Sequence, residues 1–129
     1  MNSSEAACVT HARQVRLRDS SNAYSHSGEI KEIIPPIEHA RKMERLGAGE
    51  IIINSINNDG CMNGYDINII RQISTEVNIP VIACGGAGKL DHFKEAIFQG
   101  KASAVAAGSM FVYYGNKNGI LINYPEKNI

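Results

Sequence analysis

The chain has 129 residues, 43% of them hydrophobic, and its 13 basic and 13 acidic side chains cancel to a net charge of zero at pH 7. This length fits about one domain with a real core, and the balanced charge argues against nucleic acid or an acidic membrane as partner, so a small ligand is expected. The polar start has no signal-peptide core and no apolar run reaches the roughly 18 residues that span a bilayer, which predicts a cytoplasmic protein without membrane contact. The three cysteines, Cys8, Cys61 and Cys84, are widely spaced. They predict reduced thiols rather than disulfides, and neither a metal nor another cofactor is implied.

The first 24 residues carry few apolar positions, and only Gln14 to Asp19 alternates weakly between polar and apolar side chains. We predict that residues 1–24 form an atypical segment, either poorly ordered or an edge strand, ahead of a domain over residues 25–129. A helix is expected from Pro36 to Gly47, because proline suits the first helical position and glycine suits a helix end. The expected buried face of this helix consists of Ile37, Ala40, Met43 and Leu46.

Short apolar runs and amphipathic stretches alternate through the rest of the chain. Strands are expected at residues 50–55, 81–84 and 103–111, and residues 120–125 are either a final strand or a segment packed on the body. Two further helices are expected: one capped by Asp66 with Ile70, Ile73 and Val77 on its buried face, and one that uses Phe93, Ala96 and Ile97 and stops at Gly100. The alternation predicts an α/β fold of parallel strands joined by right-handed helical crossovers.

Three loops rich in glycine and small polar residues follow these strands, at residues 56–65, 85–89 and 108–109. The carboxyl ends of parallel strands meet at one edge of a sheet, where α/β proteins bind ligands. Glycines let backbone amides converge on an anion, and a following helix adds its positive end, so the "GG" and "GS" pairs predict a phosphate site. The spacing of "CGGAGKL" fits neither a P-loop nor a dinucleotide fingerprint. The alternative is a tight strand-to-helix turn without a ligand.

Three stretches together resemble one enzyme family: "GAGEIIINSINNDGCMNGYDINIIRQIS", "IPVIACGGAGKLDHFKEAI" and "ASAVAAGSMF". Over about Ser25 to Phe111 they resemble the C-terminal half of the cyclase subunit of imidazole glycerol phosphate synthase, a (βα)8 TIM barrel of histidine biosynthesis. The resemblance implies a cyclase that joins ammonia from a glutaminase (amidotransferase) partner to a phosphorylated ribonucleotide-type substrate. Its products are imidazole glycerol phosphate and an aminoimidazole carboxamide ribonucleotide. The tail over residues 108–125 is similar to a paralogous branch that acts in amidination of bacterial surface sugars, so both branches stay open.

The resemblance also implies roles for individual residues. A terminal phosphate of the substrate would lie against Gly60, Gly85, Gly86, Gly108 and Ser109. Asp59 would arrange the mouth of the site by contacting substrate hydroxyls or loop amides, although Asp before Gly is also ordinary turn chemistry. Asn54 stands where the family commonly has threonine, and Cys84 stands where it commonly has serine. Both would be small strand-end groups at the barrel mouth, but a thiol at Cys84 is a poorer donor than a hydroxyl, and we expect it to be inert.

Glu50 matches a charged residue that lines the ammonia entrance at the opposite, amino-terminal face of the barrel and meets the glutaminase. A solvated charge at the start of a strand is the alternative for Glu50. We expect His26, His39 and His92 to lie at the surface rather than to act as ligands.

The acid–base machinery of the family is not recognisable in this chain. The family uses two aspartates, on the first and fifth strands of the barrel, because protons must leave the ammonia and reach the departing group. No apolar run before residue 25 ends in aspartate, and Asp19 is given no role. The sequence therefore predicts half a barrel, either a fragment of a longer product or a chain whose open sheet edges pair in a homodimer. A phosphate-binding half-barrel without chemistry is the alternative to an enzyme.

Overall fold

The described part of the chain is built on a six-stranded sheet with the strand order β3-β2-β1-β4-β5-β6. The structure, a computed structural model, describes residues 12–19, 22–25, 30–31, 35–114 and 119–120, and the side chains of residues 35–112. The strands are β1 (Ala12–Asp19), β2 (Asn22–Ser25), β3 (Ile30–Lys31), β4 (Glu50–Ser55), β5 (Val81–Cys84) and β6 (Ala104–Val105). β1, β4, β5 and β6 pair in parallel, whereas β2 and β3 extend the sheet in antiparallel fashion beyond β1.

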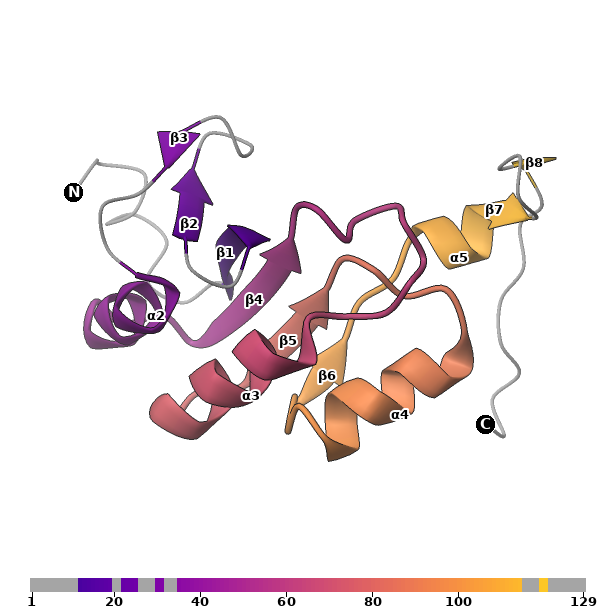
Figure 1. Cartoon of the computed structure of the whole chain (residues 1–129). Coiled ribbons are helices and arrows are strands. Elements are labelled where there is room, and N and C mark those ends of the chain that lie inside the picture. The colour runs from indigo at the N-terminus through magenta and orange to yellow at the C-terminus, as the bar shows by residue number, and fades with distance from the viewer. Residues whose placement is uncertain (1–11, 20–21, 26–29, 32–34, 115–118, 121–129) are drawn as a thin grey trace.

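Helices connect the parallel strands and cover one face of the sheet (Figure 1). They are α2 (Pro36–Arg45) before β4, α3 (Ile67–Glu76) between β4 and β5, and α4 (Leu90–Phe98) between β5 and β6. α2 contacts α3, and α3 contacts α4. A short helix, α5 (Ser109–Val112), follows β6 and leads to an antiparallel pair of two-residue strands, β7 (Tyr113–Tyr114) and β8 (Gly119–Ile120). The predicted α/β class, with parallel strands and helical crossovers, is confirmed.

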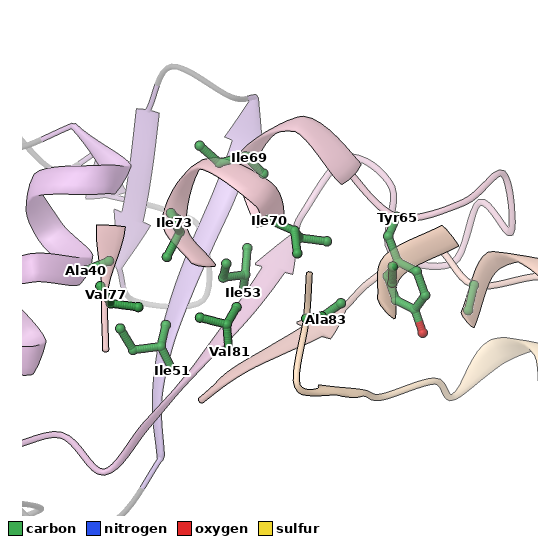
Figure 2. Close-up of a cluster of buried hydrophobic side chains, with 13 residues drawn as sticks. Ala40, Ile51, Ile53, Tyr65, Ile69, Ile70, Ile73, Val77, Val81 and Ala83 are labelled. Atoms are coloured by element: carbon green, nitrogen blue, oxygen red, sulfur yellow. The ribbon is translucent and has the colours of Figure 1, made fainter. Parts of the chain in front are cut away.

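The core lies between the central strands and α3, and isoleucines supply most of its largest fully buried side chains (Figure 2). Alternate residues of β4 and β5 face the helices, so that Ile51 and Ile53 pack beside Val81 and Ala83. The helix supplies Ile69, Ile70 and Ile73 at helical spacing. The other face of the sheet carries Ile52 and Ile82, which are half-buried.

The residues at the helix ends act as the sequence predicts, with one exception at the end of α4. Asp66 caps α3 by accepting a hydrogen bond from the Ile69 amide at 3.4 Å, and Gly47 follows α2 with a φ of 94°. At the end of α4 it is Lys101, not Gly100, that has the left-handed φ, 56°. Gly100 is required for space instead, because a Cβ there would lie 2.7 Å from the Ala96 carbonyl oxygen.

Two residues predicted for buried helix faces are exposed. Leu46 is 41% exposed because α2 ends at Arg45, so Leu46 leaves the helical repeat. Ile97 is 36% exposed beside Phe98, which is 79% exposed, because α4 instead buries His92 and Ala96.

The segment at Gln14 to Asp19 belongs to a strand, but not to an edge strand. β1 lies between β2 and β4, and it runs parallel to β4 with Arg16 in register with Asn54 and Leu17 in register with Ser55. The boundary proposed after residue 24 falls inside β2. β1 was hard to predict because a strand with neighbours on both sides normally shows a stronger apolar pattern than "QVRLRD".

The strand expected over residues 103–111 is shorter than predicted. Only Ala104 and Val105 pair with β5, and the chain turns into α5 at Ser109. Residues 120–125 are described at Ile120 alone, and the rest of that stretch lies outside the described residues. Within the described ranges, no helix has both the length and the apolar composition that crossing a membrane requires.

Candidate functional site

The loops that follow β4, β5 and β6 meet around one small cavity at the carboxyl edge of the sheet. Its volume is about 30 Å³, space for about two water-sized spheres. The lining residues are Asp59, Gly60, Cys84, Gly85, Gly86, Ala87, Ala107, Gly108 and Ser109. The structure therefore brings together seven of the eight residues that the sequence nominated for phosphate or substrate binding.

The glycines of the loop after β5 have left-handed backbone conformations, or leave no room for a side chain, so that other residues do not fit there. Gly85 and Gly86 have φ values of 84° and 122°. A Cβ on Gly86 would lie 2.0 Å from the Gly64 carbonyl oxygen, and a Cβ on Gly88 would lie 2.2 Å from the Met62 carbonyl oxygen. The loop after β4 and the loop after β5 are thus in backbone contact.

Two hydrogen bonds fix the relative positions of the three loops. The Gly64 amide donates to the Gly86 carbonyl at 2.7 Å, joining the first loop to the second. The Tyr65 hydroxyl donates to the Ala106 carbonyl at 2.7 Å, joining the first loop to the third. Tyr65 is 6% exposed, and its burial, with a smaller contribution from Cys84, raises the pKa of its hydroxyl. Tyr65 is not recognisable as a site residue from the sequence, because a single aromatic residue after a turn looks like any core residue.

The lining of the cavity is suited to an anion held by backbone amides. The amides of Gly86, Gly108 and Ser109 donate no hydrogen bond to the rest of the described chain. A Cβ on Gly60 would lie 4.0 Å from the Ser109 hydroxyl oxygen, so the first and third loops face each other here. Among the described residues that line the cavity, the charged one is Asp59, which is exposed.

Asn54 does not line the cavity, although the sequence nominated it. It is 5% exposed on β4, and a Cβ on Gly85 would lie 2.6 Å from its Oδ1 atom. Asn54 thus lies against the glycine loop from the sheet side, and its buried Oδ1 has no hydrogen-bond partner in the described structure. Cys84 ends β5, is half-buried and does line the cavity.

His92 is not at the surface, so that prediction is wrong. The residue is 7% exposed in the first turn of α4, and its Nδ1 atom accepts a hydrogen bond from the Gly88 amide at 3.0 Å. The neighbouring Asp91 and Lys94 are exposed, but His92 points the other way, toward the loops. His39 is half-buried, and His26 lies outside the described residues.

Glu50 lies at the opposite edge of the sheet from the cavity, as the first residue of β4, and is half-buried. In the described part of the chain, no three His, Cys, Asp or Glu side chains come together in a way that holds a metal ion. The described residues that line the cavity carry three polar side chains, a hydroxyl on Ser109, a thiol on Cys84 and a carboxylate on Asp59, besides their backbone groups.

Residues 4–118 match the family described as histidine biosynthesis protein. The chain belongs to this family. Its α/β fold is part of the TIM barrel that the family forms, as the sequence predicted. The resemblance to the cyclase subunit is also confirmed by curated relatives.

One relative is the protein named imidazole glycerol phosphate synthase subunit HisF from Lachnoclostridium phytofermentans. It is 49% identical to this chain over 109 residues, which cover 82% of this chain and 42% of the relative. A putative hisF2 subunit of the same synthase from Pseudomonas aeruginosa is 40% identical over 107 residues, covering 83% of this chain and 43% of the relative. A putative hisF3 subunit of the synthase from Vibrio vulnificus is 38% identical over 105 residues, covering 81% of this chain and 40% of the relative. The chain spans about two fifths of the length of these relatives.

Proposed function

We propose that this chain is part of a cyclase subunit of imidazole glycerol phosphate synthase and that its cavity holds a terminal phosphate of the substrate. The observation that carries the proposal is the meeting of three strand-end loops around Gly86, Gly108 and Ser109, whose amides have no acceptor within the described chain. Similarity to relatives named as subunits of that synthase supports the choice of substrate class.

The geometry favours binding by dipoles rather than by an ion pair. Amides that point into a concave site bind anions well, and α4 begins at Leu90 with the positive end of its dipole near the glycine loop. The Ser109 hydroxyl adds a donor opposite Gly60. The cavity admits the leading phosphate oxygens, so the remainder of the ligand lies in the mouth, where Asp59 accepts hydrogen bonds from its hydroxyl groups.

Phosphate binding would orient the substrate but would not close the imidazole ring. Ring closure needs groups that take up and deliver protons, and we assign no described residue to that role. β1 provides a strand beside β4 that ends at Asp19, and Asp19 pairs with Asn22 of β2 through the backbone. A phosphate-binding half-barrel without turnover is therefore the second candidate, because the described residues offer a place for an anion but no assigned acid or base.

Two partners belong to the same proposal. A glutaminase subunit would deliver ammonia at the amino-terminal edge of the sheet, where Glu50 begins β4. A second copy of the chain would cover the sheet edges, because β6 has one neighbour in the described sheet and strand edges pair readily. A cytoplasmic location fits both partners.

Phosphate binding is tested by titrating the purified chain with inorganic phosphate and following its thermal unfolding. A ligand at ten times its dissociation constant stabilises the folded state by about 1.4 kcal/mol. Gly108→Asp adds a carboxylate to the cavity at a position with open space around the new Cβ, and we expect it to abolish the shift. Gly108→Asn is the neutral control of equal size and should keep part of it.

Sodium chloride at matched ionic strength separates specific binding from screening. An unchanged melting temperature of the native chain at millimolar phosphate would refute the site. Ammonia-dependent turnover by the 129-residue chain would refute the second candidate and support the enzyme.

A further inference from the structure

We propose that His92 is a positioning residue that holds the glycine loop of residues 85–89 in its anion-binding conformation. This inference rests on the proposed phosphate site, but it concerns a residue that does not line the cavity. His92 acts through the backbone of the loop, and its contacts link the loop after β4, the loop after β5 and α4.

The glycine loop needs such an anchor because of its composition. Glycine has more backbone freedom in the unfolded chain than any other residue type, so ordering Gly85, Gly86 and Gly88 carries a large entropic cost. One end of the loop is fixed by β5, since Ala83 and Cys84 pair with Ile53 and Asn54 of β4. The other end is fixed where the Gly88 amide donates to His92 Nδ1 at 3.0 Å.

His92 also contacts the loop that follows β4. A Cβ on Gly64 would lie 3.6 Å from both Cδ2 and Nε2 of the His92 ring, so the ring lies directly over this glycine. Gly64 in turn donates its amide to the Gly86 carbonyl at 2.7 Å. His92 thus contacts both glycine-containing loops: Gly88 through a hydrogen bond and Gly64 through the face of its ring. The two loops are in turn joined by the hydrogen bond between Gly64 and Gly86. Through these contacts, the position of the ring sets the position of the Gly86 amide.

The imidazole combines two properties that this position requires. Its Nδ1 atom is an acceptor for the Gly88 amide, which places the proton of the neutral ring on Nε2. Its flat face and ring edge fit against Gly64 in a space where the residue is 7% exposed. Leucine would fill much of this space without an acceptor, whereas the Oδ1 atom of asparagine reaches about the position of Nδ1.

The experiment compares the native chain with His92→Asn and His92→Leu by NMR and by phosphate titration. In the native chain, nitrogen shifts of His92 should report the Nε2-protonated tautomer, and the Gly88 amide should be protected from hydrogen exchange. His92→Leu should speed hydrogen exchange at the Gly88 amide and raise the dissociation constant for inorganic phosphate by about tenfold, because one hydrogen bond that orders the loop is lost. His92→Asn should restore most of the protection and of the affinity.

The outcomes separate this inference from the phosphate site itself. A native chain that does not bind phosphate refutes the proposed function, while the tautomer and the Gly88 exchange still test the anchor. An Nδ1-protonated ring or an unprotected Gly88 amide in the native chain overturns the anchor, even if His92→Leu does not fold. Equal phosphate affinity in all three proteins also overturns it, because a residue that merely fills the core would then suffice.

Discussion

The Tyr65 hydroxyl donates a hydrogen bond to the carbonyl oxygen of Ala106, 2.7 Å away, across 41 positions of sequence. Tyr65 ends the loop that follows β4, and Ala106 directly follows β6, so this bond spans the strand that lies between them. In Figure 2, Tyr65 is set apart from the isoleucine cluster, with its hydroxyl oxygen turned away from Ile70. One side chain thus connects the core to the frame of the cavity.

Removing the Tyr65 hydroxyl should therefore affect both stability and ligand binding. Tyr65→Phe keeps the ring in the core but leaves the Ala106 carbonyl without its donor, and we expect a loss of about 1 kcal/mol in the free energy of unfolding. Urea unfolding measures this loss, and phosphate titration should show weaker binding because the third loop is less constrained. Unchanged stability together with unchanged affinity would show that the bond does not hold the loops.

The same residue predicts a loss of stability at alkaline pH. Burial raises the pKa of Tyr65 in the folded state, whereas the unfolded chain has the ordinary tyrosine pKa of about 10. Below that pH both states keep the proton and the contribution of Tyr65 is complete. Above it the unfolded chain releases the proton while the folded chain retains it, so the free energy of unfolding falls as the pH rises. Tyr65→Phe should lack this part of the decline. Denaturant unfolding from pH 8 to 11 compares the two slopes, and identical slopes would contradict the assignment.

The elements with strong periodicity were predictable from the sequence. The run Glu50–Ser55 and the face of Ile70 and Ile73 are strand and helix because burial on both sides of a strand, or on one side of a helix, leaves an unmistakable apolar pattern. The meeting of the three glycine loops also followed, since parallel strands place their carboxyl ends together. These inferences depend on local pattern and on general topology.

What the sequence did not reveal depends on contacts between distant segments. β1 has a weak pattern, and only its pairing with β4 and β2 shows that it is an interior strand. His92 looked like a surface residue because its neighbours in the chain are charged, and its partners at Gly88 and Gly64 become visible only when the loops are folded. Asn54 lies near the end of its strand, as expected, but Gly85 packs against its side chain and separates it from the cavity.

The isoleucine core should be sensitive to truncation in a way that the exposed helix end is not. Ile73 is fully buried between α3 and the sheet, so Ile73→Ala should lower the free energy of unfolding by about 2–5 kcal/mol through lost burial and a residual cavity. Leu46→Ala removes a similar number of atoms from a side chain that is 41% exposed, and it should cost less than about 1 kcal/mol. Equal losses of unfolding free energy for the two variants in urea would show that Leu46 is buried in the core, as the sequence predicts.

The glycines around the cavity should divide into required and replaceable positions. Gly88 has no left-handed φ, so its requirement is purely one of space: a Cβ there would lie 2.2 Å from the Met62 carbonyl oxygen and 2.6 Å from Met62 Cβ. Because the first of these atoms is backbone, Gly88→Ala must push the two loops apart, and we expect a destabilisation of about 1–3 kcal/mol, as for an overpacked core.

Gly108 is the matched control, since no atom lies within 4 Å of a Cβ placed on it. Gly108→Ala should be tolerated or should stabilise the chain by up to about 1 kcal/mol, by reducing the freedom of the unfolded state. Thermal and urea unfolding of the two variants decide the matter, and a Gly88→Ala protein as stable as Gly108→Ala would mean that the loops after β4 and β5 are not in backbone contact.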